Sequence, residues 1–156
     1  MIEELRPVYQ QLEETYDALR AVLEEIPDDR LDWRPAKGML SASELTQHIA
    51  RANRTYGRVI FAEPKGDRPP WVQGLGRSEL LERVEASLTL AREDFEAITP
   101  ERLHAPCADH WGPFVIPVQG PLDTLWFAIN MVRHTAYHVG QLNTYSLLLE
   151  GGAEPG

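Results

Sequence analysis

The sequence predicts an all-α fold, a four-helix bundle with two long connections. Four long segments carry apolar residues at alternating steps of three and four, which is the spacing of one helical face. The segments 62–77 and 100–121, which separate the last three helices, are rich in proline and glycine. Three prolines between Trp111 and Pro121 argue against a regular sheet and leave room only for a short β-hairpin around Phe114 to Val118.

The first helix is expected from about Ile2 to Ile26. Pro7 lies near its start, where a missing N–H costs least, and Pro27 helps to end it. Its inward positions are Ile2, Leu5, Tyr9, Leu12, Tyr16, Leu19, Leu23 and Ile26. These steps form a heptad-like seam, which is typical of helices that pack nearly antiparallel in a bundle.

The second helix is expected to begin at Ser41 and to run to about Phe61. Ser41 to Glu44 form a capping box, in which the serine accepts a free backbone N–H and the glutamate reaches back to the serine backbone. The apolar stripe of this helix includes Leu45, Ile49 and Tyr56, and His48 falls within the stripe. The pattern therefore places the His48 imidazole on the buried face.

The third helix is expected from Ser78, as its N-cap, to Ile98, and the fourth from Pro121 to Gly151. The fourth is the most apolar long segment and carries two neighbouring apolar stripes, so we expect it at the centre of the fold. One stripe contains His134 and His138.

Length and composition favour one globular domain over residues 1–150 with a flexible tail at 151–156. The 43% hydrophobic and 25% charged residues are typical of a globular chain. A net charge of −9 opposes binding to nucleic acid. Polar residues interrupt the fourth helix, so no membrane span is expected. Cys107 is the only cysteine and the first residues do not form a signal peptide, which together favour the reducing cytoplasm.

The histidines are the main chemical indication in the sequence. His134 and His138 are four residues apart, so they lie one turn apart on the same helical face. With His48, three imidazoles point inward from two helices, and burying them without partners is costly. One divalent cation would satisfy all three. The alternative is that they are core histidines without metal, bonded to backbone or to neighbours such as Asn130 and Tyr145.

Two known helical metal sites fit the sequence poorly. A zincin carries a glutamate base after its first histidine, where this chain has Thr135, and a di-iron bundle needs Glu-x-x-His pairs that the fourth helix lacks. A rival zinc site is conceivable at His104, Cys107 and His110, which are evenly spaced in a predicted loop. Pro106 and the lack of a clear fourth ligand weaken that alternative.

The capped segment from Ser41 to His48, followed much later by His134-x-x-x-His138-x-Gly-Gln141, resembles the DinB-like family. The resemblance covers nearly the whole chain. It implies an up-down-down-up bundle, a homodimer, and one divalent ion, zinc or nickel, held by three histidines with open positions. By position, the ligands would be His48, His134 and His138. Many members carry glutamate at the position of Thr135, and this chain departs from them there.

Two polar residues of the fourth helix are expected to support the ligands. Gln141 lies one turn past His138 and Asn130 lies one turn before His134, so either side chain can hydrogen-bond a ligand imidazole. For Gln141, an ordinary polar residue near the end of the bundle is an equally good interpretation.

A three-histidine ion with open positions supports two chemistries. In one, the ion holds a low-molecular-weight thiol, such as bacillithiol or mycothiol, for transfer to a small electrophile. In the other, it activates water for hydrolysis. Analogy within the wider superfamily favours thiol transfer, so we expect a small-molecule substrate. The net charge and the interrupted fourth helix argue against nucleic acid and membrane as partners. The non-catalytic alternative is a metal-binding, stress-associated dimer.

Overall fold

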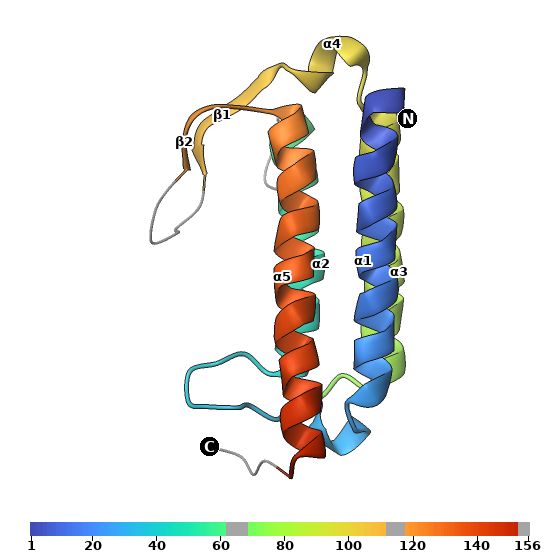
Figure 1. Cartoon of the computed structure of the whole chain (residues 1–156), viewed down its shortest axis with the longest axis vertical. Coiled ribbons are helices and arrows are strands. Elements are labelled where there is room, and N and C mark those ends of the chain that lie inside the picture. The colour runs from blue at the N-terminus through green and yellow to red at the C-terminus, as the bar shows by residue number, and fades with distance from the viewer. Residues whose placement is uncertain (62–68, 112–117, 153–156) are drawn as a thin grey trace.

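Four long helices lie side by side, and a β-hairpin projects from one end of the bundle in the computed structural model (Figure 1). The structure describes residues 1–61, 69–111 and 118–152; the side chains of 110, 111 and 118–120 are outside this description. The long helices are α1 (Arg6–Glu25), α2 (Ala42–Phe61), α3 (Arg77–Ala97) and α5 (Thr124–Glu150). The short elements are 3₁₀ turns at Glu3–Leu5 and Asp28–Arg30, α4 (Pro100–Leu103), β1 (Pro106–Trp111) and β2 (Val118–Asp123).

The described part of the chain is thus mostly helical, as predicted, but it also contains a small antiparallel sheet. Pro106 pairs with Asp123 and Trp111 pairs with Val118, with irregular register between them. The predicted hairpin exists, but its strands lie further apart in sequence than expected; most of the segment Phe114 to Val118 is outside the described residues. Both strands of a two-stranded hairpin are edge strands, so they tolerate proline.

Helix α5 begins later than predicted, because the second strand of the hairpin extends past Pro121. Pro121 lies within β2, and the helix begins only at Thr124. Asp123 is the N-cap, because its Oδ1 accepts a hydrogen bond of 2.8 Å from the backbone N–H of Trp126. Proline has no side-chain acceptor, whereas an aspartate can satisfy one of the free N–H groups of the first turn.

Helices α2 and α3 begin in different ways. At α2, the Ser41 N–H donates to Glu44 Oε2 at 2.8 Å and the Glu44 N–H donates to Ser41 Oγ at 3.2 Å, which is the predicted capping box. At α3 the predicted N-cap, Ser78, already lies inside the helix. The N-cap is Gly76, whose N–H donates to Glu79 Oε2 at 2.9 Å.

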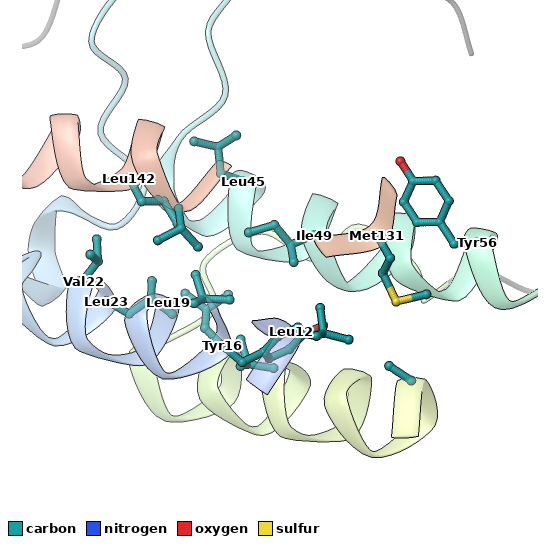
Figure 2. Packing of buried hydrophobic residues seen from close by; sticks show 14 of the residues in the cluster. Leu12, Tyr16, Leu19, Val22, Leu23, Leu45, Ile49, Tyr56, Met131 and Leu142 are labelled. Carbon is teal, nitrogen blue, oxygen red and sulfur yellow. The ribbon is translucent and has the colours of Figure 1, made fainter. Parts of the chain in front are cut away.

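Leucines and aromatic residues of all four long helices form one core (Figure 2). Helix α5 packs most extensively on α1 and α2. In Figure 2, Leu19 of α1, Ile49 of α2 and Leu142 of α5 lie in this shared interior, and all three are almost completely buried. None of the described helices combines the length and the apolar character that a membrane span needs.

A buried polar cluster links the four helices. The Tyr16 hydroxyl lies 2.8 Å from Ser87 Oγ and accepts a hydrogen bond of 2.7 Å from Asn53 Nδ2. Asn53 Nδ2 also donates to Thr135 Oγ1 at 3.2 Å, and Thr135 donates to the Met131 carbonyl at 2.9 Å. Burial raises the pKa of Tyr16, so its hydroxyl stays neutral. Because the cluster satisfies its own hydrogen bonds, it fixes the helices in one register next to His134.

Candidate metal centre

Helices α2 and α5 bring the three predicted histidines together. His134 Nε2 lies 3.1 Å from His48 Nε2 and 3.1 Å from His138 Nε2. One ring nitrogen from each residue falls within 4.8 Å of the other two. Among the described residues, this is the group of histidine, cysteine and carboxylate side chains whose spacing suits a metal ion. The helical spacing predicted from the sequence therefore gives a real cluster.

Gln141 fixes the proton position on His138. Gln141 Oε1 lies 2.6 Å from His138 Nδ1, and Gln141 Nε2 donates to the Tyr137 hydroxyl at 3.3 Å. Since a carbonyl oxygen can only accept, Nδ1 of His138 carries the hydrogen and its Nε2 presents a lone pair to the other histidines. This is the usual arrangement behind a metal-binding histidine.

Burial keeps the cluster uncharged. Desolvation, followed by the charges of His138 and Arg51, lowers the pKa of His48 to about 4. Desolvation, with smaller effects of His138, His48 and Arg133, lowers the pKa of His134 to about 3. Desolvation also lowers the pKa of His138. Near neutral pH all three rings are therefore neutral, which is the form that binds a metal.

The donor set fits one divalent ion. Imidazole nitrogens bound to zinc stand about 2.0–2.1 Å from it, so two of them in a tetrahedral site are about 3.3 Å apart. The two spacings of 3.1 Å are close to that value. The same spacing also allows N–H···N hydrogen bonds without metal. His134 Nδ1 is buried with no partner among the described residues, so packing against the Tyr56 ring, 5.7 Å between ring centroids, holds this imidazole.

The other predicted polar neighbours have partners of their own. Asn130 donates to the Tyr56 hydroxyl at 2.9 Å and accepts from Arg133. It therefore reaches the cluster through Tyr56, whose ring packs against His134, and through Arg133, whose charge bears on His134. Tyr145 donates to the Leu40 carbonyl at 2.9 Å. Thr135 is turned into the buried polar cluster, so its side chain offers no base to the histidines.

The rival cluster in the hairpin is engaged differently. His104 Nδ1 lies 3.0 Å from Asp123 Oδ2, and Cys107 Sγ lies 3.3 Å from Thr124 Oγ1. The side chain of His110 is outside the description. These contacts join the base of the hairpin to the start of α5, which gives both residues a structural role.

Two arginines near the cluster did not emerge from the sequence. The charge of Arg51 bears on His48, and that of Arg133 bears on His134. Arg51 also donates to the Pro69 carbonyl and lies over the half-exposed Trp71 ring, 4.9 Å from its centroid. The sequence could have indicated Arg51, because it follows His48 by three residues and residues at that spacing share a helical face.

These features define a class of protein, a helical bundle with a three-histidine group between its second and last long helices. The chain belongs to the DinB superfamily, whose family model matches residues 11–142. No curated protein matches it.

Two solved structures show the same fold. One is a conserved protein from Enterococcus faecalis, 14% identical, with a TM-score of 0.71 over 98% of this chain and 100% of that one. The other is a DinB-like protein from Bacillus subtilis, 17% identical, with a TM-score of 0.67 over 97% of this chain and 96% of that one.

Proposed function

We propose that this protein binds one divalent ion, zinc or nickel, through His48, His134 and His138, and that it transfers a low-molecular-weight thiol to small electrophiles. The observation that carries the proposal is the convergence of three neutral imidazoles, with Nε2 spacings of 3.1 Å. When bound, such an ion is a Lewis acid that lowers the pKa of a thiol or water molecule.

The chain's own residues favour a thiol over water. The metal-suited group among the described residues consists of three histidines, so no carboxylate within that group can serve as a base for activating water. Thr135 is bonded to Asn53 and Met131 and cannot supply one. The positive charges of Arg51 and Arg133 bear on the site and would stabilise an anionic thiolate. In the transfer, the thiolate sulfur bonds to an electrophilic carbon whose leaving group departs with the bonding electron pair.

Hydrolysis is the second candidate, and a non-catalytic metal-binding dimer is the third. Cobalt substitution separates thiol use from the other two, because a thiol bound to Co²⁺ produces a sulfur-to-metal charge-transfer band. We expect that band on titration with bacillithiol or mycothiol, and expect it to be absent from His134→Ala. Turnover of an ester without thiol would favour the hydrolase.

We also infer that the helices follow the up-down-down-up order. The contacts that support it are Tyr9 with Phe95 and Tyr16 with Ser87 between α1 and α3, Asn53 with Thr135 and Tyr56 with Asn130 between α2 and α5, and Glu25 with Ser146 between α1 and α5. In the first two helix pairs one residue number rises as the other falls, which indicates antiparallel neighbours. The last contact joins two C-terminal ends, which indicates parallel ones.

A homodimer and a cytoplasmic location complete the proposal. Ile129, Tyr137 and Leu147 of α5 are at least half exposed, so an apolar surface is open for a second copy. Light scattering coupled to size exclusion would give twice the chain mass for a dimer and the chain mass of 17.7 kDa for a monomer.

The deciding experiment is elemental mass spectrometry on untagged protein. We expect about one divalent ion per chain in the wild type and at least a tenfold loss in His134→Ala. His104→Ala is the matched control, because that histidine is exposed and lies at the hairpin. No metal in the wild type, even after dialysis against zinc and nickel, would leave the proposal without support.

A further inference from the structure

A pocket of about 410 Å³ opens between α2 and α3. Pockets of about 300–1,000 Å³ are large enough to bury most of a small molecule. The residues that decide its chemistry are Ala50 and Arg54 on α2 and Arg83, Ala86, Leu90 and Asp94 on α3. Pro69 and Pro70, from the connection before α3, line it as well.

This pocket is separate from the histidine cluster. The cluster lies between α2 and α5, and α3 contributes nothing to it. Successive residues of an α-helix turn by roughly 100°, so His48 projects from a different face of α2 than Ala50 and Arg54 do. A ligand in this pocket would therefore contact other side chains than a ligand of the metal centre.

The floor of the pocket is polar in composition but offers few free hydrogen-bonding groups. Asn53 and Ser87 line it, and both are buried. Ser87 Oγ is bonded to Tyr16, and the Asn53 amide is bonded to Tyr16 and Thr135. With these groups engaged, alanine, leucine and proline side chains provide most of the contact surface. An apolar molecular body suits such a surface.

Three charged side chains give the lining of the pocket a net positive charge. Arg54 and Arg83 contribute two positive charges and Asp94 one negative charge, so the lining carries +1 in a chain whose net charge is −9. Arg83 donates to the Pro70 carbonyl at 3.2 Å, which holds its guanidinium beside the loop. Asp94 lies against Gly57 of α2, where a Cβ would collide with its carboxylate. A guanidinium is the preferred partner of a carboxylate or similar oxyanion.

We propose that this pocket is a second ligand site, for a small amphipathic anion with an apolar body and one carboxylate or sulfonate group. The apolar part contacts Ala50, Ala86 and Leu90, and the anionic group lies beside Arg83.

Fluorescence titration with anilinonaphthalene sulfonate, an aromatic anion, tests the site. Phenylnaphthylamine has the same aromatic body without the sulfonate and is the neutral comparison. Ala86→Trp fills the pocket from an exposed helical position, and Ala18→Trp on α1 is its control, since Ala18 is also exposed and mid-helix. Arg83→Gln removes the cation while keeping a polar side chain. Circular dichroism checks that each variant is folded.

We expect saturable binding of the anionic probe, one per chain, weakened at least tenfold by Ala86→Trp and unchanged by Ala18→Trp. Arg83→Gln should weaken the sulfonate probe about fivefold and the neutral probe less than twofold. His134→Ala should leave both affinities unchanged. Wild-type affinity in Ala86→Trp, or no saturable binding, would overturn the site, and an equal loss of both probes in Arg83→Gln would overturn its preference for anions.

Discussion

At the scale of single residues, the cluster depends on which nitrogen of each ring faces inward. The His138 ring is held by Gln141 at 2.6 Å, whereas the His134 ring is held by packing alone on its Nδ1 side. A hydrogen bond behind an imidazole fixes its tautomer and its ring orientation, so at the proposed metal site we expect Gln141 to strengthen metal binding by His138.

Gln141→Leu should therefore weaken zinc binding by roughly 10–100-fold, the usual effect of removing a hydrogen-bond partner behind a ligand. Gln141→Glu keeps an acceptor at the same place and should retain the affinity. Competition with a chromophoric chelator measures both. Equal affinities of Gln141→Leu and the wild type would show that the 2.6 Å contact does not orient the ligand.

Acid should destabilise the metal-free protein in a specific pH window. The pKa values of His48 and His134, about 4 and about 3, lie below the ordinary value of 6.5, so the unfolded chain binds more protons between these limits. Stability is complete above pH 6.5 and falls as the pH drops from there towards 3. The lowered pKa of Glu44 adds a loss only below 4.5.

Urea unfolding after chelator treatment, at pH 7.5 and pH 5.5, measures this dependence. We expect a lower urea midpoint at pH 5.5 than at pH 7.5. The difference between the two midpoints should be smaller for His134→Asn, because this variant has one fewer imidazole with a lowered pKa. An identical pH dependence in that variant would contradict the assignment of the window to the buried rings.

The sequence predicted the three clustered histidines but not all of their surroundings. Spacing along one helix placed His134 and His138 on a shared face, and the stripe of α2 placed His48 inward. Asn130 has the same helical relation to His134, yet its amide bonds to Tyr56, which comes from another helix. The periodicity of a sequence shows which residues share a face of one helix, but it does not predict which residue of another helix each of them contacts.

At the scale of the elements, the start of α2 matters because it sets the depth and rotation of His48. The side chain of each of Ser41 and Glu44 accepts a hydrogen bond from the backbone N–H of the other. Ser78 resembles Ser41 in sequence, as a serine before an apolar stripe, but it lies within α3 behind the true N-cap, Gly76. Ser41 is followed three residues later by Glu44, whereas Ser78 is followed there by Leu81, so only Ser41 carries the full capping-box pattern, and only Ser41 caps a helix.

Ser41→Ala should therefore lower the free energy of unfolding by about 1 kcal/mol, and Ser78→Ala should change it by less than half of that. Denaturant midpoints of the two variants give a direct comparison. A larger loss for Ser78→Ala would restore the N-cap that the sequence indicated.

The hairpin shows where local patterns fail at this scale. Proline at the first position of a helix is a frequent signal, and Pro121 carries it, but the chain is still in β2 at that point. Asp123 ends the strand and begins the helix, and it also holds His104 at 3.0 Å. The Asp123 carboxylate makes two contacts at this position, whereas Pro121 is merely compatible with a helix start, so the helix begins after Asp123.

At the scale of the whole molecule, the four helices were predictable because each repeats the same steps of three and four over about twenty residues. The pocket between α2 and α3 was not, because it depends on the distance between two helices and on Pro69 and Pro70, which line it from the connection before α3. The buried cluster of Tyr16, Asn53 and Thr135 likewise joins residues distant in sequence.

The histidine cluster joins α2 to α5, so an ion bound there should act as a crosslink within the folded bundle. A ligand at a hundred times its dissociation constant stabilises the folded state by about 2.7 kcal/mol. For a domain of this size, each kcal/mol raises the melting temperature by roughly 2–4 °C, so zinc should raise it by roughly 5–10 °C. Scanning calorimetry of chelator-treated protein, with and without added zinc, measures the shift.

His48→Ala separates a crosslink between helices from binding to α5 alone. That variant keeps His134 and His138 four residues apart on one helix, so any zinc bound by this pair alone would still raise the melting temperature. If the ion joins α2 to α5, the shift in His48→Ala should fall below a third of the wild-type value. A shift of wild-type size would instead place the ion on α5 and would leave His48 as a neighbour of the site rather than part of it.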